Sequence, residues 1–122
     1  MTIDELRARI DSMDEQLVAL LNMRATCAIE IGRIKRRMAI PVYQPEREAE
    51  VGRHVRSVNA RLGGPLSGEA VGRLFERIID EARQLEACAD GDGDGPEPDL
   101  AAGDMGPEQI ERSARGAMGG EV

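Results

Sequence analysis

One run of apolar residues at helical spacing, from residue 3 to residue 38, dominates the first third of the chain. The apolar positions recur in alternating steps of three and four, which is the pattern of a heptad seam on an α-helix. They are Ile3, Leu6, Ile10, Met13, Leu17, Leu20, Cys27, Ile31, Ile34 and Met38. Thr2 is the expected N-cap, and about 36 helical residues span roughly 54 Å. The rest of a 122-residue chain cannot cover so long a helix, so the pattern indicates a coiled coil or an intertwined oligomer.

Two shorter helices are predicted after a break at residues 39–45, where two prolines disfavour helical angles in the residues before them. The second helix begins near Pro45 and ends before the turn at residues 63–65, whose sequence is Gly-Gly-Pro. The third helix follows Ser67 as its N-cap, and its apolar periodicity stops after Ala87. The predicted fold is therefore all-α: a three-helix protomer with a very long first helix, assembled as an intertwined homodimer.

Charge divides the chain near residue 87. Residues 1–87 contain 14 basic and 14 acidic side chains, whereas residues 88–122 contain nine acidic and two basic ones. The formal net charge of −7 therefore belongs entirely to the second segment. That segment is also rich in Gly, Asp, Pro and Ala, a composition typical of disorder. We expect a helical domain over 1–87 followed by a disordered acidic tail over 88–122.

The composition argues against several classes of function. With one Phe, one Tyr and no Trp, the chain lacks the aromatic residues on which nucleic-acid bases stack. No apolar run approaches the roughly 18–20 residues of a membrane span, and the N-terminus lacks the pattern of a secretory signal. An Asp-Gly repeat at 90–95 imitates a calcium loop, but Ala101 stands where its final carboxylate belongs. We expect a cytoplasmic protein without metal or cofactor that binds neither nucleic acid nor membrane.

Arg24 breaks the heptad seam at a position that demands an apolar residue. A guanidinium on a core-facing seam is costly unless an anion meets it. Lys35 lies eleven residues further on, about 20° away on the same face and about 16 Å along the axis. It is the only lysine in a chain with fifteen arginines, which favours a role as a compact point-charge donor. Together the two cations predict a site for a small dianion such as a dicarboxylate.

Three further polar residues continue apolar stripes of the shorter helices. Extending the stripe of the second helix backwards reaches Glu48 and then Gln44. Extending the stripe of the third helix forwards from Ala82 by one turn reaches Glu86. Stripes also fray into solvent at helix ends, so Gln44 and Glu86 are weaker candidates than Arg24, which lies in the middle of its helix.

Arg7 flanks the seam of the first helix about 25 Å from Arg24, too far to touch the same small ligand within one chain. If an antiparallel second chain crosses near residues 18–19, its Arg7 lies opposite residues 29–31. That position is between Arg24 and Lys35. The long helix and its cations thus both predict a dimer whose sites are shared between chains.

The sequence closely resembles the all-helical class of chorismate mutases over residues 4–87. The matching segments are Leu6-Arg7-Ala-Arg-Ile10-Asp-Ser-Met-Asp14, Leu20-Leu21-Asn-Met-Arg24, Ile31-Gly32-Arg-Ile-Lys35, Pro45-Glu-Arg47-Glu48 and Leu74-Phe75-Glu-Arg-Ile78-Ile79, with Glu86 downstream. The resemblance implies the rearrangement of chorismate to prephenate, an early step towards phenylalanine and tyrosine. This reaction is pericyclic and requires no nucleophile, metal or cofactor.

The resemblance also implies how the two carboxylates of chorismate are bound. Arg24 and the other chain's Arg7 pair with them, and Arg47 assists. Guanidinium forks suit this task because each can donate two parallel hydrogen bonds to a carboxylate.

At the reacting centre, the resemblance implies that Lys35 donates to the ether oxygen and that Glu86 lies opposite it. Glu48 accepts from the ring hydroxyl, Gln44 assists from the loop, and Ala82 belongs to the substrate-binding set. Gln44 stands where an Asp is familiar in this family, whereas Gln or Glu occurs at the position of Glu86. A carboxyl group must be protonated before it donates, so we expect activity to fall as pH rises.

Two other functions fit parts of the sequence. Isochorismate pyruvate-lyase is a related enzyme that shares the helical fold and the basic residues, but the position of Glu48 tends to be apolar there. A non-catalytic helical dimerisation or regulatory module of the aromatic pathway explains the seam. It gives no reason for Arg24 on that seam, so we favour the mutase.

Overall fold

Residues 1–89 are described by the computed structural model, and they form three helices without a strand. Helix α1 spans Ile3–Met38, α2 spans Pro45–Leu62 and α3 spans Gly68–Cys88. The all-α prediction is confirmed, and α3 ends one residue beyond the expected boundary. The predicted tail otherwise lies outside the described residues, so its disorder stays a prediction. None of the helices among residues 1–89 is long and apolar enough to cross a membrane.

Side-chain caps fix where the first and third helices begin. Thr2 Oγ1 accepts from the amide of Glu5 at 3.1 Å, and the Glu5 carboxylate accepts from the amide of Thr2 at 2.9 Å. This reciprocal capping box satisfies two amides that the first turn leaves without helical partners. Ser67 Oγ accepts from the amide of Ala70 at 3.1 Å in the same way. Both predicted N-caps are therefore confirmed.

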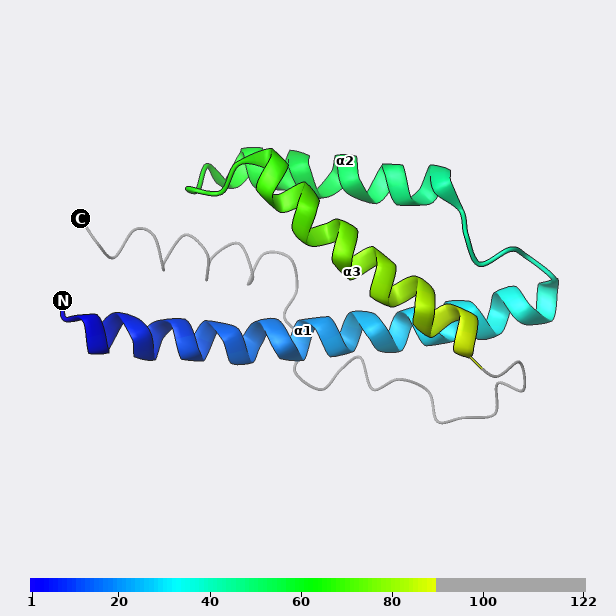
Figure 1. Cartoon of the computed structure of the whole chain (residues 1–122), viewed down its shortest axis with the longest axis horizontal. Coiled ribbons are helices and arrows are strands. Elements are labelled where there is room, and N and C mark those ends of the chain that lie inside the picture. Colours follow the sequence, from blue (N-terminus) through cyan, green and yellow to red (C-terminus); the bar gives the residue numbers. More distant parts are fainter. Residues whose placement is uncertain (90–122) are drawn as a thin grey trace.

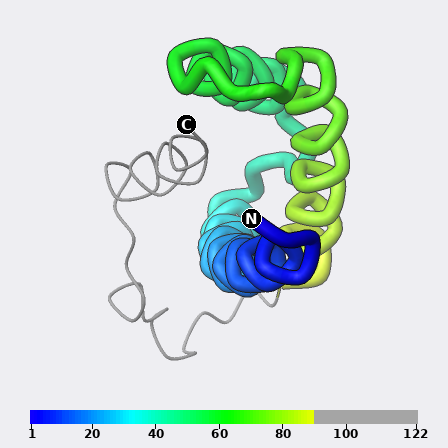
Figure 2. Tube along the Cα trace, turned by 90° about the vertical axis from the view of Figure 1, so that its left-hand side faces the viewer, coloured from blue at the N-terminus to red at the C-terminus, as the bar shows by residue number. Residues whose placement is uncertain are grey.

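Helix α3 bridges the other two helices. The C-terminal end of α3 packs against α1, and the N-terminal end of α3 packs against α2. No Cα of α1 lies within 8 Å of a Cα of α2. Viewed at right angles, α1 and α2 lie apart, and α3 runs from one to the other along one side (Figure 2). In Figure 1, α3 crosses diagonally between them. The loop at 39–44 and α3 therefore set the position of α2 relative to α1.

The crossing of α1 and α3 depends on Gly32. A Cβ atom at this position would lie 2.5 Å from the carbonyl oxygen of Glu86 and 2.6 Å from its Cα. The Cβ of Ala89 lies 3.0 Å from the same position, and both Ala89 and Ala28, one turn earlier on α1, are buried. Small side chains thus let the two backbones approach closely, and this approach determines where the end of α3 meets α1.

The N-terminal half of α1 is uncovered in the single chain. Ile3 is 67% exposed and Leu17 is 55% exposed, although both lie on the heptad seam. Among residues 1–89, the buried apolar side chains are only Ala28, Val71 and Ala89. A long apolar stripe of this kind typically marks a protein–protein contact. The intertwined dimer itself is not tested by a single chain and stays a prediction.

We predict that Gly32→Ala destabilises the protein, because the new methyl group would meet backbone atoms that cannot rotate away. Overpacking of this kind costs about 1–3 kcal/mol of unfolding free energy. Urea denaturation followed by circular dichroism measures the change.

Gly52→Ala in α2 is the matched control. Its Cβ would meet only the flexible Arg56 guanidinium, at 3.5 Å, so the helix propensity of alanine should stabilise it by up to about 1 kcal/mol. A Gly32→Ala variant as stable as the wild type would show that α3 does not depend on this close approach.

Candidate active site

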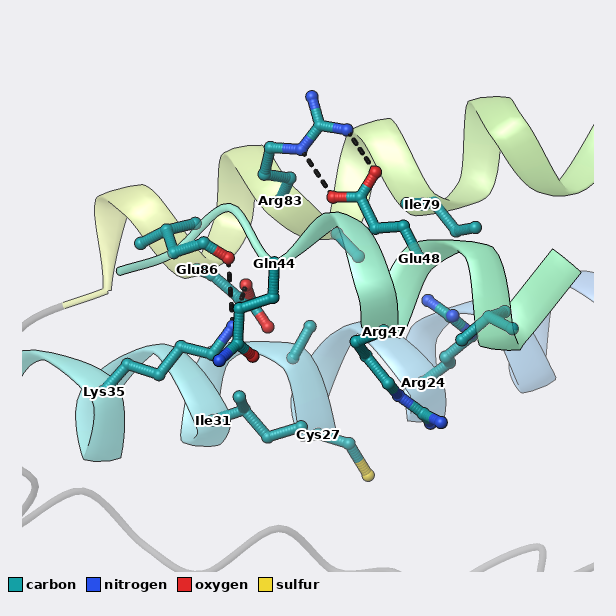
Figure 3. Close-up of a pocket in the computed structure, with 14 residues that line it drawn as sticks. Arg24, Cys27, Ile31, Lys35, Gln44, Arg47, Glu48, Ile79, Arg83 and Glu86 are labelled. Atoms are coloured by element: carbon teal, nitrogen blue, oxygen red, sulfur yellow. Dashed lines mark hydrogen bonds and ion pairs between the residues drawn. The ribbon is translucent and has the colours of Figure 1, made fainter. Parts of the chain in front are cut away.

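A pocket of about 410 Å³ lies between α1 and the other two helices. Its size falls in the range of small-molecule sites, about 300–1,000 Å³. Figure 3 shows the side chains that converge on it from all three helices and from the loop before α2. They are Arg24, Cys27, Ala28, Ile31, Lys35, Val42, Gln44, Arg47, Glu48, Val51, Ile79, Ala82, Arg83 and Glu86.

The pocket brings together seven of the eight predicted site residues. These are Arg24, Lys35, Gln44, Arg47, Glu48, Ala82 and Glu86. The eighth, Arg7, lies exposed on the N-terminal half of α1 and does not line the pocket. This separation agrees with the expectation that one chain cannot bring Arg7 and Arg24 to the same small ligand. The roles of all eight residues stay predictions.

Lys35 and Glu86 form an ion pair at one end of the pocket. The Lys35 ammonium donates to Glu86 Oε2 at 3.2 Å and to the carbonyl oxygen of Val42 at 3.0 Å. The Lys35 and Glu86 side chains are only 11% and 13% exposed. Gly32 lies one turn before Lys35, so the close crossing of α1 and α3 also delivers Glu86 to this lysine. Since an ammonium has three N–H donors, one remains for a ligand.

Arg24 lies on α1 at the other end of the pocket from Lys35 (Figure 3). It is half-buried, and it has no hydrogen-bond or ion-pair partner among residues 1–89. Arg47 reaches the same pocket from α2, where it also pairs with Glu50. The guanidinium on the heptad seam therefore faces the pocket with its charge unmatched.

Arg83 is a pocket residue that the sequence analysis missed. Its Nε donates to Glu48 Oε2 at 2.9 Å and its NH2 donates to Glu48 Oε1 at 2.6 Å, which makes a bidentate pair. Its guanidinium also lies 5.0 Å from the centre of the Tyr43 ring. The hydrogen bonds to Glu48 raise the pKa of Arg83 above its ordinary value, so it stays cationic.

A periodic signal for Arg83 was present in the sequence. Ile79, Ala82, Arg83 and Glu86 stand at i, i+3, i+4 and i+7, which is one face of a helix. Ala82 and Glu86 were assigned to that face, and Arg83 belongs between them. Its pairing with Glu48, 35 residues away, could not be inferred from the spacing.

The pocket is positively charged overall and therefore suits an anion. Its lining has four cationic side chains (Arg24, Lys35, Arg47 and Arg83) and two carboxylates (Glu48 and Glu86), an excess of two positive charges. Lys35 and Arg83 are paired with these two carboxylates, and Arg47 pairs with Glu50 outside the lining, which leaves Arg24 as the lining cation without a partner among residues 1–89. Within residues 1–89, no group of three or more His, Cys, Asp or Glu side chains is arranged to hold a metal ion. The arrangement matches a small dicarboxylate.

Three known proteins that are similar to this chain each have a mutase in their names. The bifunctional chorismate mutase/prephenate dehydratase of Pseudomonas aeruginosa is 44% identical over 86 residues, which cover 66% of this chain and 23% of that protein. The 4-amino-4-deoxychorismate mutase of Streptomyces pristinaespiralis is 30% identical over 116 residues, which cover 95% and 83% of the two chains. The chorismate mutase of Methanocaldococcus jannaschii is 32% identical over 83 residues, which cover 67% and 81%.

The matches cover different shares of the relatives' lengths. The chain spans about a quarter of the length of the bifunctional relatives it matches. No solved structure matches it. The sequence model of the family described as chorismate mutase type II matches residues 6–87, which include nearly all of α1 and α3 and the whole of α2. On this match, the chain belongs to the chorismate mutase type II family.

Proposed function

We propose that the protein is a chorismate mutase, an isomerase that converts chorismate to prephenate in the biosynthesis of phenylalanine and tyrosine. The observation that carries the proposal is the pocket's excess of two positive charges, with Arg24 unpaired on an otherwise apolar seam. Chorismate has two carboxylates, which these charges would balance. A cytoplasmic location is part of the proposal and remains a prediction.

The rearrangement requires the protein to hold the substrate in a reactive conformation and does not require a nucleophile. The two reacting ends of a flexible dianion must be brought together in a compact conformer, and charge that develops as the ether bond breaks must be stabilised. Arg24 and Arg47 would hold the carboxylates through guanidinium forks. The free N–H of Lys35 would donate to the ether oxygen, and its ion pair with Glu86 would keep the ammonium in place.

The active unit in this proposal is a homodimer. The exposed seam of α1, including Ile3 and Leu17, would be covered by the same seam of a second, antiparallel chain. The partner's Arg7 would then lie opposite residues 29–31, close to Arg24 of the first chain. The dimer would supply both the apolar burial that one chain lacks and a second arginine for the dianion.

A second candidate substrate is 4-amino-4-deoxychorismate, which carries an amino group in place of the ring hydroxyl. The relative named for this substrate aligns with 95% of the chain, further than the bifunctional relatives do. Two functions of different classes also fit the helical fold: the isochorismate pyruvate-lyase reaction and non-catalytic dimerisation. Glu48 in the pocket favours a mutase over the lyase, and the unpaired Arg24 favours an enzyme over a structural module.

The first test replaces Arg24 by leucine. Because leucine suits the heptad seam, Arg24→Leu should fold at least as stably as the wild type. Its kcat/KM for chorismate should nevertheless fall by about a hundred-fold or more, since the guanidinium that would hold and orient one carboxylate is lost. Chorismate depletion is followed continuously, and isochorismate is assayed separately for pyruvate.

Arg73→Leu is the matched control for that test, because Arg73 is exposed on α3 and does not line the pocket. It should keep full activity. Pyruvate release from isochorismate without prephenate from chorismate would identify the lyase instead. Full activity of Arg24→Leu would favour a non-catalytic role for the seam arginine.

The second test asks whether sites are shared between chains. Arg7→Ala and Arg24→Ala should each be nearly inactive alone, because each dimer would lack one arginine in both sites. When the two variants are co-expressed at equal levels, half of the dimers are mixed and have one complete site each. About a quarter of wild-type activity should therefore return. If no activity returns although light scattering and mass spectrometry detect mixed dimers, both arginines must come from the same chain.

The third test asks which form of Glu86 supports the reaction. In the free protein the Glu86 carboxylate accepts from Lys35 at 3.2 Å, whereas only a protonated Glu86 could itself donate a hydrogen bond to the ether oxygen. If the protonated form is the active one, kcat/KM for chorismate should fall as pH rises from 4.5 to 8.5. Glu86→Gln should flatten the profile, because an amide donates at any pH. A level wild-type profile would mean that Glu86 acts only as the acceptor that positions Lys35.

A further inference from the structure

Glu48 is held by Arg83 rather than standing free in the pocket. Each carboxylate oxygen accepts one hydrogen bond from the guanidinium, at 2.9 and 2.6 Å. A bidentate pair of this kind fixes the plane of the carboxylate as well as its position. The guanidinium also lies over the ring of Tyr43, 5.0 Å from the ring centre, which is a second contact that restrains it. The orientation of Glu48, a side chain of α2, is therefore set by α3 and the preceding loop.

The same pair lowers the net charge that Glu48 presents. A carboxylate offers about four lone-pair positions, and Arg83 uses two of them. Glu48 can therefore still accept a hydrogen bond from a ligand in the pocket that it lines. Its negative charge, however, is offset by a guanidinium that stays protonated and that also lies 3.5 Å from Asp80 Oδ1. What Glu48 presents to a ligand is an oriented acceptor of reduced charge.

The two candidate substrates differ at the group that Glu48 would receive. The ring hydroxyl of chorismate is a neutral donor, whereas the amino group of 4-amino-4-deoxychorismate is an ammonium at neutral pH. A neutral donor needs only an oriented acceptor. An ammonium must give up hydration on entering the pocket, and only an uncompensated negative charge would offset that loss. Next to Arg83 it would meet a like charge instead.

We propose that Arg83 is a specificity-determining positioning residue, which orients Glu48 to accept from a neutral ring hydroxyl and disfavours a cationic amine at the same position. The inference rests on the proposed mutase function and goes beyond it, because it selects between two substrates that the same reaction would accept. Arg83 acts through Glu48 and need not touch the substrate.

A purely structural ion pair is the simpler explanation of this contact. Arg83 and Glu48 are both half-buried, and pairs at the protein surface contribute little to stability. Such a pair would affect both substrates equally, since it would act only through folding or general pocket shape. The ratio of the two kcat/KM values therefore separates the explanations, whereas stability or a single activity does not.

The test measures kcat/KM for chorismate and for 4-amino-4-deoxychorismate with wild type, Arg83→Met, Arg83→Lys and Glu48→Gln. Wild type should prefer chorismate. Arg83→Met leaves Glu48 with its full charge and should shift the ratio towards the amino substrate by about tenfold or more. Arg83→Lys keeps the charge and should retain the preference of the wild type. Glu48→Gln removes the carboxylate that makes the bidentate pair, leaves Arg83 only Asp80 at 3.5 Å, and should shift the ratio in the opposite direction.

Arg73→Met is the matched control. Arg73 lies on the same helix, is exposed and does not line the pocket. Its ratio should equal that of the wild type. Circular dichroism checks that each variant folds. If Arg83→Met does not fold, Arg83→Gln removes the same charge and takes its place. The substrate ratios of Arg83→Gln and Glu48→Gln should then shift in opposite directions.

The outcomes distinguish the inference from the function on which it rests. Equal losses for both substrates in Arg83→Met, or a wild type that prefers the amino substrate, would overturn the inference while leaving a mutase. A wild type that converts neither substrate would overturn the proposed function itself. An unchanged ratio in Glu48→Gln would show that Glu48 does not receive the ring substituent.

Discussion

The contact of α1 with the end of α3 is the constraint on which the pocket depends. At Gly32 the two backbones approach so closely that no side chain fits, and one turn later Lys35 meets Glu86 at 3.2 Å. Because α2 has no direct packing on α1, its position follows from this crossing through α3 and from the loop whose Val42 carbonyl also binds Lys35. A small shift at Gly32 would therefore move both walls of the site relative to the cations of α1.

Stability and function make opposite demands on α1. An apolar residue in place of Arg24 would complete the heptad seam, yet the unmatched guanidinium is what would attract an anion to the pocket in the proposed function. The single chain buries few apolar side chains among residues 1–89, so it has little stability to lose. The exposed seam on the N-terminal half of α1 suggests how this is offset, because a second copy would bury it.

Local interactions explain what could be predicted from the sequence. The bounds of α1 and the caps at Thr2 and Ser67 followed from signals within a few residues of each helix end. Four pocket residues (Arg24, Gln44, Glu48 and Glu86) followed from polar side chains on apolar stripes, and Lys35 followed from its place on the face of Arg24. Arg47 and Ala82 were predicted only from the family resemblance. Arg83 did not follow, because its role depends on Glu48, which is close in space but 35 residues away in sequence. The position of Arg7 depends on a second chain, so neither the sequence nor one protomer determines it.

The origin of the pocket's charges separates two tasks. The cations Arg24 and Lys35 come from α1, whereas the acceptors Glu48 and Glu86 come from α2 and α3. In the proposed mechanism, binding of a dianion would depend mainly on the helix that would also form the dimer, with Arg47 of α2 assisting. Recognition of the ring would depend on how α3 orients the acceptor of α2. A change at Arg83 would then alter ring recognition without removing the cations proposed to hold the carboxylates.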